Sequence, residues 1–474
     1  MPEHFRITRN RREFICDAFC GFGALAYSSM YAASINNPLA PKRPHIEAKA
    51  KSVIFLFMAG GPSHIETFDP KPLLNKLNGE KRPATFGEAK YQYVNEASRC
   101  LGTKRTFKRY GKSGIEVSDL LPHIGEQIDD IAVIRSCHAD MVVHSAAQYQ
   151  LFSGRVIPGF PSMGSWVIYG LGSESEALPA YVVMPDPKGA LEAGQPMYTQ
   201  GFLPAIYQPT MFRPGPKPVL NLDLPSGVTL DQRRETLRLI KGLNEAGLKP
   251  EDDDFAARIN SYDLAFKMQT EAPAIFDLSN EPEKTREMYG IGKEPTDDYG
   301  RRCLMARRLV EKGVRFVCVV SGGGPGNMQW DAHEDIEENH NRMAPQTDQP
   351  VGALLQDLKR RGLLDETLVM WHSEFGRMPI SQRGVGRDHN PGAMTVFLAG
   401  AGIQGGQRIG ATDEVGYKAE QQVITPNDLH ATLLHLLGMD HKRLTYYFNG
   451  RHMRLTDVHG ELIPQIVGDG KQRG

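Results

Sequence analysis

The sequence has little of what marks several common protein classes. Its 55 basic and 56 acidic residues leave a formal net charge of −1, so nothing indicates nucleic acid or an anionic membrane surface as a partner. Only six cysteines occur, and none form a Cys-x-x-Cys pair, which argues against a zinc–thiolate site. After the first 36 residues no apolar run is long enough to span a bilayer, so we expect no membrane insertion.

The composition is that of a globular protein with many loops. Of the 474 residues, 40% are hydrophobic and 23% are charged. The 48 glycines and 32 prolines indicate many connecting segments, where binding and catalytic residues often lie.

The N-terminus has the pattern of an export signal. Residues 1–36 contain a basic start, a short apolar stretch and small residues near Ala32. Arg11 and Arg12, followed by "EFI", resemble a twin-arginine leader, which predicts a periplasmic or extracellular protein. Asp17 interrupts the apolar stretch, which makes a membrane-spanning helix a poor alternative. The other alternative is a disordered basic tail.

The rest of the chain alternates strand and helix patterns. Such alternation predicts a doubly wound α/β fold, with a mainly parallel sheet covered on both faces. We assign residues 37–52 to a linker, 53–460 to the α/β domain and 461–474 to a C-terminal tail. An insertion or cap interrupts the domain at about residues 185–300. Continuous apolar runs predict buried strands at 52–58, 131–136, 180–184, 314–320, 367–372 and 394–400, and helical spacing predicts helices at 299–313, 349–362 and 425–438.

Polar residues gather where the predicted strands end or begin. Ligands of open α/β sheets bind beyond the carboxyl ends of the strands, so we expect these residues at one edge of the sheet. The predicted metal ligands are Asp69, Asp331, His333, Glu374, Asp388 and His389.

Histidine together with carboxylate favours a divalent transition metal. One or two zinc or manganese ions are the expected cofactor, and calcium is the alternative if oxygen ligands dominate. Such ions activate water and neutralise charge on a phosphoryl or sulfuryl group. His340 and the acids at 334–338 fit a solvated helix face. Nearby arginines could bind ester oxygens or form salt bridges with the same carboxylates: Arg135, Arg155, Arg377 and Arg387.

Several blocks resemble one known family. "FLFMAGGPSHIETFDPKP", "WDAHED", "DLKRRGLLDETLVMWHSEFGRMP", "GRDHNPGAM" and "DLHATLLHLLGMDHKRLTYYFNGR" resemble domain of unknown function 1501 (DUF1501) from about Val53 to Val458. This resemblance implies the fold of alkaline phosphatases and sulfatases, and hydrolysis of a phosphate or sulfate ester of a small molecule or glycan. It implies His144 and Ser145 as catalytic residues, with His144 a ligand or general base and Ser145 a nucleophile. We assign substrate binding to Ser63, His64, Arg155 and Arg377.

The resemblance is incomplete at chemically essential positions. No cysteine stands at the nucleophile position, which His144 occupies. Gly60 and Gly61 occupy the place of an aspartate after the first strand, so Glu66 or Asp69 would have to replace it. Glu374 would replace an aspartate, and Phe375 stands where a ligand histidine is usual. The alternative to a hydrolase is therefore a degenerate member that binds a metal or an anionic glycan without turnover; a third reading is a structural or secretion-linked protein.

Overall fold

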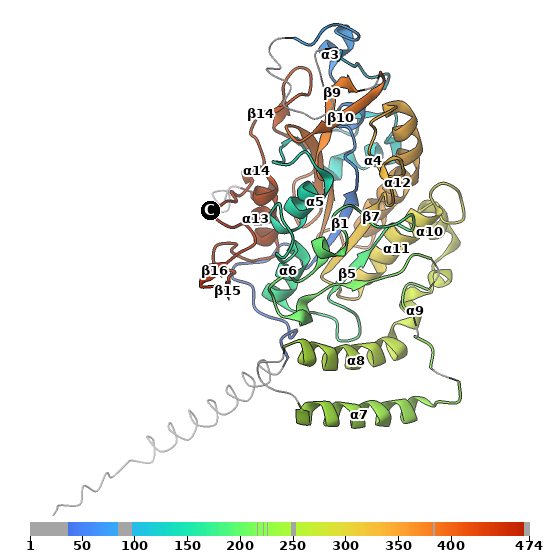
Figure 1. The fold of residues 1–474 in the computed structure, drawn as a ribbon. Coiled ribbons are helices and arrows are strands. Elements are labelled where there is room, and N and C mark those ends of the chain that lie inside the picture. Colours follow the sequence, from blue (N-terminus) through green and yellow to red (C-terminus); the bar gives the residue numbers. More distant parts are fainter. Residues whose placement is uncertain are drawn as a thin grey trace, which may run out of the picture.

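A single large sheet lies at the centre of the protein (Figure 1). The computed structural model describes residues 37–83, 97–215, 217–220, 222–224, 226–247, 253–382 and 384–468. The predicted export signal and the end of the predicted tail lie outside these residues. Within them, no helix combines the length and apolar character needed to cross a membrane. The sheet has eight strands in the order β12-β4-β11-β8-β1-β7-β5-β6. Their bounds are β1 Ser52–Met58, β4 Ile131–Cys137, β5 Tyr181–Met184, β6 Thr210–Met211, β7 Phe316–Ser321, β8 Thr367–His372, β11 Met394–Ala399 and β12 Gln407–Ile409.

All strand pairs in this sheet are parallel except those of β11. This strand runs antiparallel to both of its neighbours, β4 and β8, with Met394 opposite Cys137. It therefore begins at the edge where β4 and β8 end. Residues just before β11 and residues just after the parallel strands consequently meet at one edge. Each of the six predicted apolar runs forms a strand of this sheet, and the prediction of a mainly parallel α/β fold is confirmed.

Helices cover both faces of the sheet, so β1 is buried on both sides. Val53, Phe55 and Phe57 face one hydrophobic cluster, whereas Ile54 and Leu56 face the other. The first cluster includes residues of α5 (His144–Ser153), α6 (Met163–Leu171) and α13 (Pro426–Leu436); the second includes residues of α4 (Pro122–Glu126), α11 (Asp297–Glu311) and α12 (Ile336–Arg360).

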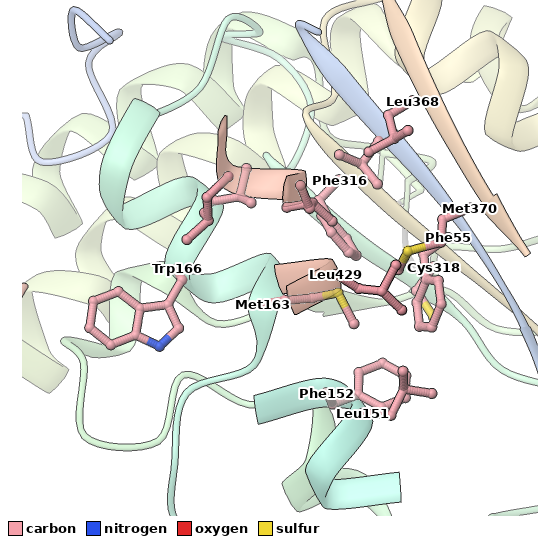
Figure 2. Packing of buried hydrophobic residues seen from close by; sticks show 14 of the residues in the cluster. Phe55, Leu151, Phe152, Met163, Trp166, Phe316, Cys318, Leu368, Met370 and Leu429 are labelled. Carbon is pink, nitrogen blue, oxygen red and sulfur yellow. The ribbon is translucent and has the colours of Figure 1, made fainter. Parts of the chain in front are cut away.

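Helix α5 is anchored on β1 by aromatic packing. The Phe152 ring meets Phe55 edge-on, with ring centroids 5.3 Å apart, and it meets Phe57 at 5.2 Å. Figure 2 shows Phe152 and Leu151 of α5 beside Phe55 and Leu429. This packing fixes α5, and with it the first residue of the helix, His144, relative to the sheet.

Helix α12 begins earlier than predicted. Asp335 is its N-cap and accepts hydrogen bonds from the backbone of Glu337 and Glu338. The prediction of a solvated face at His340 is wrong, since this side chain is fully buried. It packs edge-on against Trp330, with ring centroids 5.3 Å apart, and its Nε2 accepts the Ser63 backbone N–H at 2.9 Å. These contacts bury His340 between Trp330 and the segment that follows β1.

The predicted insertion has two parts. Its first part contains η3 (Gln195–Tyr198), η4 (Ala205–Tyr207) and β6, which extends the sheet beside β5. Its helices α7 (Leu230–Gly247) and α8 (Asp253–Glu271) lie at the opposite end of the ribbon from β9 (Gly376–Gln382) and β10 (Gly386–Asn390) (Figure 1). Helices α7 and α8 therefore do not cover the end of the fold that carries β9 and β10. The region also holds α9 (Pro273–Phe276), η5 (Leu278–Asn280) and α10 (Glu283–Met288).

Short elements complete the fold. Four two-stranded pairs stand outside the main sheet: β9–β10, β2–β3 (Phe107–Tyr110 and Ile115–Ser118), β13–β14 (Ala411–Thr412 and Ala419–Gln421) and β15–β16 (Tyr446–Phe448 and Arg451–Met453). The remaining short helices are α2 (His64–Thr67), α3 (Pro72–Lys76), η2 (Ile128–Asp130), η6 (Gly326–Met328) and α14 (Pro464–Val467).

Candidate metal centre

Four side chains from three regions of the chain converge at the edge of the main sheet where β4 and β8 end and β11 begins. His144 begins α5, Asp331 and His333 lie between η6 and α12, and His389 lies on β10. One ligand atom from each of the four lies within 4.8 Å of those from the others. The structure thus brings Asp331, His333 and His389, all expected as ligands, together with His144, which was expected as a catalytic residue.

The three imidazole rings are oriented by hydrogen bonds from Nδ1. His144 Nδ1 lies 2.8 Å from Glu374 Oε1, His389 Nδ1 lies 2.7 Å from the Val142 carbonyl oxygen, and His333 Nδ1 bonds to Gln382 Oε1. An oxygen acceptor leaves each Nδ1 as the donor, so Nε2 of each ring faces the centre of the cluster. Metal-binding histidines are commonly held in this way by an oxygen on the far side of the ring.

The spacing of the ligand atoms fits one metal ion. Asp331 Oδ1 lies 2.9 Å from His333 Nε2, 3.1 Å from His389 Nε2 and 3.4 Å from His144 Nε2. The Nε2 atoms of His333 and His389 are 2.9 Å apart. Ligands bonded at about 2.1 Å, with angles of about 90° to 110°, stand about 3.0 to 3.4 Å apart. His144 Nε2 is also buried, and its polar contact is the one with Asp331 Oδ1 at 3.4 Å.

The buried groups of the cluster shift one another's pKa values. Burial raises the pKa of the Asp331 carboxyl, but the Arg377 guanidinium and the three histidines outweigh this and hold it well below its usual range. Burial lowers the pKa of His389 to about 3, because the hydrogen bond to Asp331 offsets only part of the desolvation. Burial also lowers the pKa of His144, but hydrogen bonds to Asp331 and Glu374 outweigh it and raise it to about 9. An ion bound at His144 would displace that proton.

Glu374, expected as a metal ligand, lies outside the four-residue cluster and holds His144 from behind. Its Oε1 accepts from His144 Nδ1, from the Gly60 backbone N–H at 3.0 Å and from Gln148 Nε2 at 3.1 Å. Its Oε2 accepts from the Ser373 hydroxyl at 2.8 Å. Burial raises the pKa of this carboxyl, but His144 outweighs the burial and lowers it overall. Glu374 is therefore an ionised acceptor that orients His144.

Two other expected ligands have different partners. Asp388 is buried, and its Oδ1 accepts the His389 backbone N–H at 2.7 Å. Asp69 forms ion pairs with Lys71 at 3.0 Å and Arg135 at 3.7 Å, and it accepts from the Thr412 hydroxyl. Neither carboxylate belongs to the four-residue cluster described above.

The residues assigned to substrate binding are largely engaged within the protein. Arg377 is fully buried, and its guanidinium donates to backbone carbonyls and to Asp331. Arg155 pairs with Asp457 at 2.6 Å.

His64 and Ser63 are buried as well. His64 Nε2 donates to the Gly416 carbonyl at 2.8 Å, and the Ser63 hydroxyl has no hydrogen-bond partner among the described residues. Ser145 is half-buried and follows His144 on α5, so its side chain is turned about 100° around the helix from His144.

Sequence reasoning missed two supporting side chains. Gln148 lies four residues after His144, on the same face of α5, and helical spacing alone could have pointed to it. Gln382 reaches His333 from β9, and no local pattern joins these two residues. Only the pairing of β9 with β10 brings Gln382 to the cluster.

Comparisons with known proteins give a family without an activity. A family model described as "Protein of unknown function (DUF1501)" matches residues 50–467, and no curated protein matches the chain. Among solved structures, the chain is similar to a phosphonate monoester hydrolase of Agrobacterium radiobacter, with 13% identity, 91% of this chain and 78% of that chain covered, and a TM-score of 0.35. It is similar to a 2-O GAG sulfatase, with 10% identity, 91% and 76% coverage and a TM-score of 0.36. It is also similar to a protein in the alkaline phosphatase superfamily from Vibrio parahaemolyticus, with 10% identity, 85% and 70% coverage and a TM-score of 0.33. These scores are too low to carry an argument about activity.

Proposed function

Because the chain belongs to the DUF1501 family, whose description assigns no function, we propose its function from the site: a metal-dependent hydrolase of phosphate or sulfate esters. One observation carries this proposal. Three imidazole Nε2 atoms and one carboxylate oxygen converge, and each ring is held from behind by an oxygen acceptor. Such a set suits a transition metal such as zinc or manganese.

The residues around the cluster favour an anionic substrate. When bound, the ion would supply Lewis-acid activation of an ester oxygen or of water. His144, Asp331, His333 and His389 would hold it, and Glu374 would keep His144 in place. The buried guanidinium of Arg377, 2.5 Å from Asp331, adds positive charge beside the ion. Positive charge in a buried site attracts and stabilises the oxygens of a phosphate or sulfate group.

A second function is favoured by the number of ligands. Zinc is usually four-coordinate in proteins, and four protein ligands close such a site, whereas catalytic zinc keeps one position open. Zinc held by all four residues would therefore support binding without turnover. Manganese accepts more ligands and would leave positions for water and ester. Ester turnover of the manganese-loaded protein would favour the hydrolase, whereas metal binding with no turnover on zinc or manganese would favour a degenerate binding protein.

The test combines metal content with turnover. Metal should be measured by mass spectrometry on the purified protein and on the Asp331→Ala/His333→Ala variant. We expect a bound transition metal that the double variant loses. Aryl phosphates and sulfates should then be assayed with wild type and His389→Ala, with folding checked by circular dichroism. Loss of turnover in folded His389→Ala would support the proposal. A metal-loaded wild type that hydrolyses no ester of a broad panel would overturn it.

We also propose that residues 1–36 direct export. The basic start, the short apolar stretch and Arg11-Arg12 support this proposal. Fractionation of cells expressing the full chain should place it outside the cytoplasm, and Arg11→Lys/Arg12→Lys should retain it inside. Equal distribution of both proteins would contradict a twin-arginine signal.

A further inference from the structure

Arg377 occupies a cage of oxygen atoms beside the metal cluster. Its side chain is fully buried. Nε donates to the Gly61 carbonyl at 2.9 Å, and Nη1 donates to the Arg387 carbonyl at 3.1 Å. Nη2 donates to the Gly60 carbonyl and to Asp331 Oδ1, the latter at 2.5 Å. Three carbonyls and one carboxylate are the type of ligand that a hard cation takes. In this cage the guanidinium of Arg377 stands where a hard cation could bind.

The backbone after β1 is shaped to form this cage. Gly60 and Gly61 have φ angles of +106° and +81°, which favour glycine. A Cβ atom on Gly60 would lie 2.6 Å from the Asp331 backbone nitrogen, so no larger residue fits without a shift. The turn therefore brings two carbonyl oxygens to one guanidinium and packs directly against the segment that carries Asp331.

The neighbouring carboxylates are already occupied. Glu374 accepts four hydrogen bonds, including one from His144. Glu66 is fully buried and pairs with Arg387 at 2.7 Å. Asp69 pairs with Lys71. Among the described residues, a single group of histidines and acids has the spacing of a metal site.

We propose that this centre binds one divalent ion, and that the Arg377 guanidinium takes the place of a second cation. The inference rests on the same metal centre as the proposed function, but not on turnover. With an ion bound, its two positive charges balance the Asp331 and Glu374 carboxylates. The guanidinium adds a further positive charge beside Asp331, which suits an anionic ester. Because this cation is covalently part of the chain, it needs no supply from the medium.

The test is a titration of bound metal, independent of activity. Wild type should bind one equivalent of zinc or manganese and no second equivalent in excess metal. Arg377→Ala should open the oxygen cage. We expect this variant to bind an additional equivalent of calcium, or free guanidinium ion, and either should raise its melting temperature. Arg155→Ala removes an arginine from its pair with Asp457 and serves as the matched control; it should gain no such site.

Each outcome bears on the inference. Two equivalents in wild type would overturn it, as would a folded Arg377→Ala that binds neither calcium nor guanidinium. If Arg377→Ala does not fold, the wild-type stoichiometry decides alone. One equivalent of metal with no ester turnover would leave this inference standing while the hydrolase proposal fails. Two equivalents of metal together with ester turnover would overturn this inference and support the hydrolase proposal.

Discussion

Replacing Glu374 by glutamine isolates the effect of one buried charge on the metal centre. The glutamine carbonyl oxygen can take the place of Oε1 and keep the bonds from Gly60, His144 and Gln148. The amide NH₂ would then donate to the Ser373 hydroxyl oxygen. The single hydrogen of this hydroxyl is within reach of Glu374 Oε2 at 2.8 Å and of the Met58 carbonyl at 2.6 Å, so it can go to Met58 alone. Every hydrogen bond survives in this arrangement, so the fold should be kept.

The charge behind His144 should nevertheless matter for metal binding. An ionised acceptor raises the basicity of the ring nitrogen that faces the ion. Loss of such an outer partner typically costs about 10- to 100-fold in metal affinity, or about 1.4 to 2.7 kcal/mol. We expect Glu374→Gln to weaken zinc or manganese binding by this factor.

Competition with a chromophoric chelator would measure the dissociation constant of each protein. Glu176→Gln is the matched control, because Glu176 is exposed and pairs only with the exposed Lys267 in the described structure. This control should bind metal like wild type. If folded Glu374→Gln binds metal within about twofold of wild type, the assignment of Glu374 as the support of His144 is refuted.

Four further predictions test the surrounding structure. Burial lowers the pKa of His430 from 6.5 to about 4, so the unfolded chain binds more protons than the folded one between pH 6.5 and pH 4. The free energy of unfolding should therefore fall as the pH falls through this range. Denaturant unfolding at several pH values should show that His430→Gln removes up to about 3 kcal/mol of this fall. Phe152→Ala should lower the free energy of unfolding by about 3 to 5 kcal/mol, whereas a loss below about 1 kcal/mol would contradict its anchoring role. Gly60→Ala should weaken metal binding more than tenfold in the chelator assay, since the added methyl displaces the loop of the cluster. Ser145→Ala should keep most of any ester turnover, because both ring nitrogens of His144 are committed elsewhere; complete loss of turnover with metal retained would identify Ser145 as the nucleophile.

Much of the fold follows from local patterns, because buried strands have a simple signature. The strands β1, β7 and β8 are buried throughout, and the residues between their polar ends are apolar, as expected when both faces are covered. The direction of β11 carries no such signature, since its run has the same composition as a parallel strand. Its reversal is nevertheless what places His389 at the edge where the other strands end.

The candidate site was only partly accessible from sequence. Asp331, His333 and His389 are polar residues beside strand ends, and this position suggested them. The functions of Glu374 and Arg377 depend on which groups surround them after folding. A carboxylate that binds an ion and one that supports a histidine look the same in sequence. An arginine that grips a substrate and one that fills an oxygen cage look the same too.

The reversed strand also shapes how the chain must fold. Except for the pairs β5–β6 and β8–β11, no strand of the main sheet pairs with one that is close in sequence. Ser52 begins a strand whose first partner, β7, starts roughly 260 residues later, a delay of about 13 to 50 s at typical rates of protein synthesis. β4 waits about as long, until β11 and then β12 have emerged. Such non-local pairing favours slow folding, so a C-terminal truncation before β11 should leave β4 as an unpaired, aggregation-prone segment. Binding of the proposed metal ion, which would need His144 and His389 together, would therefore report that the late strands have joined the sheet.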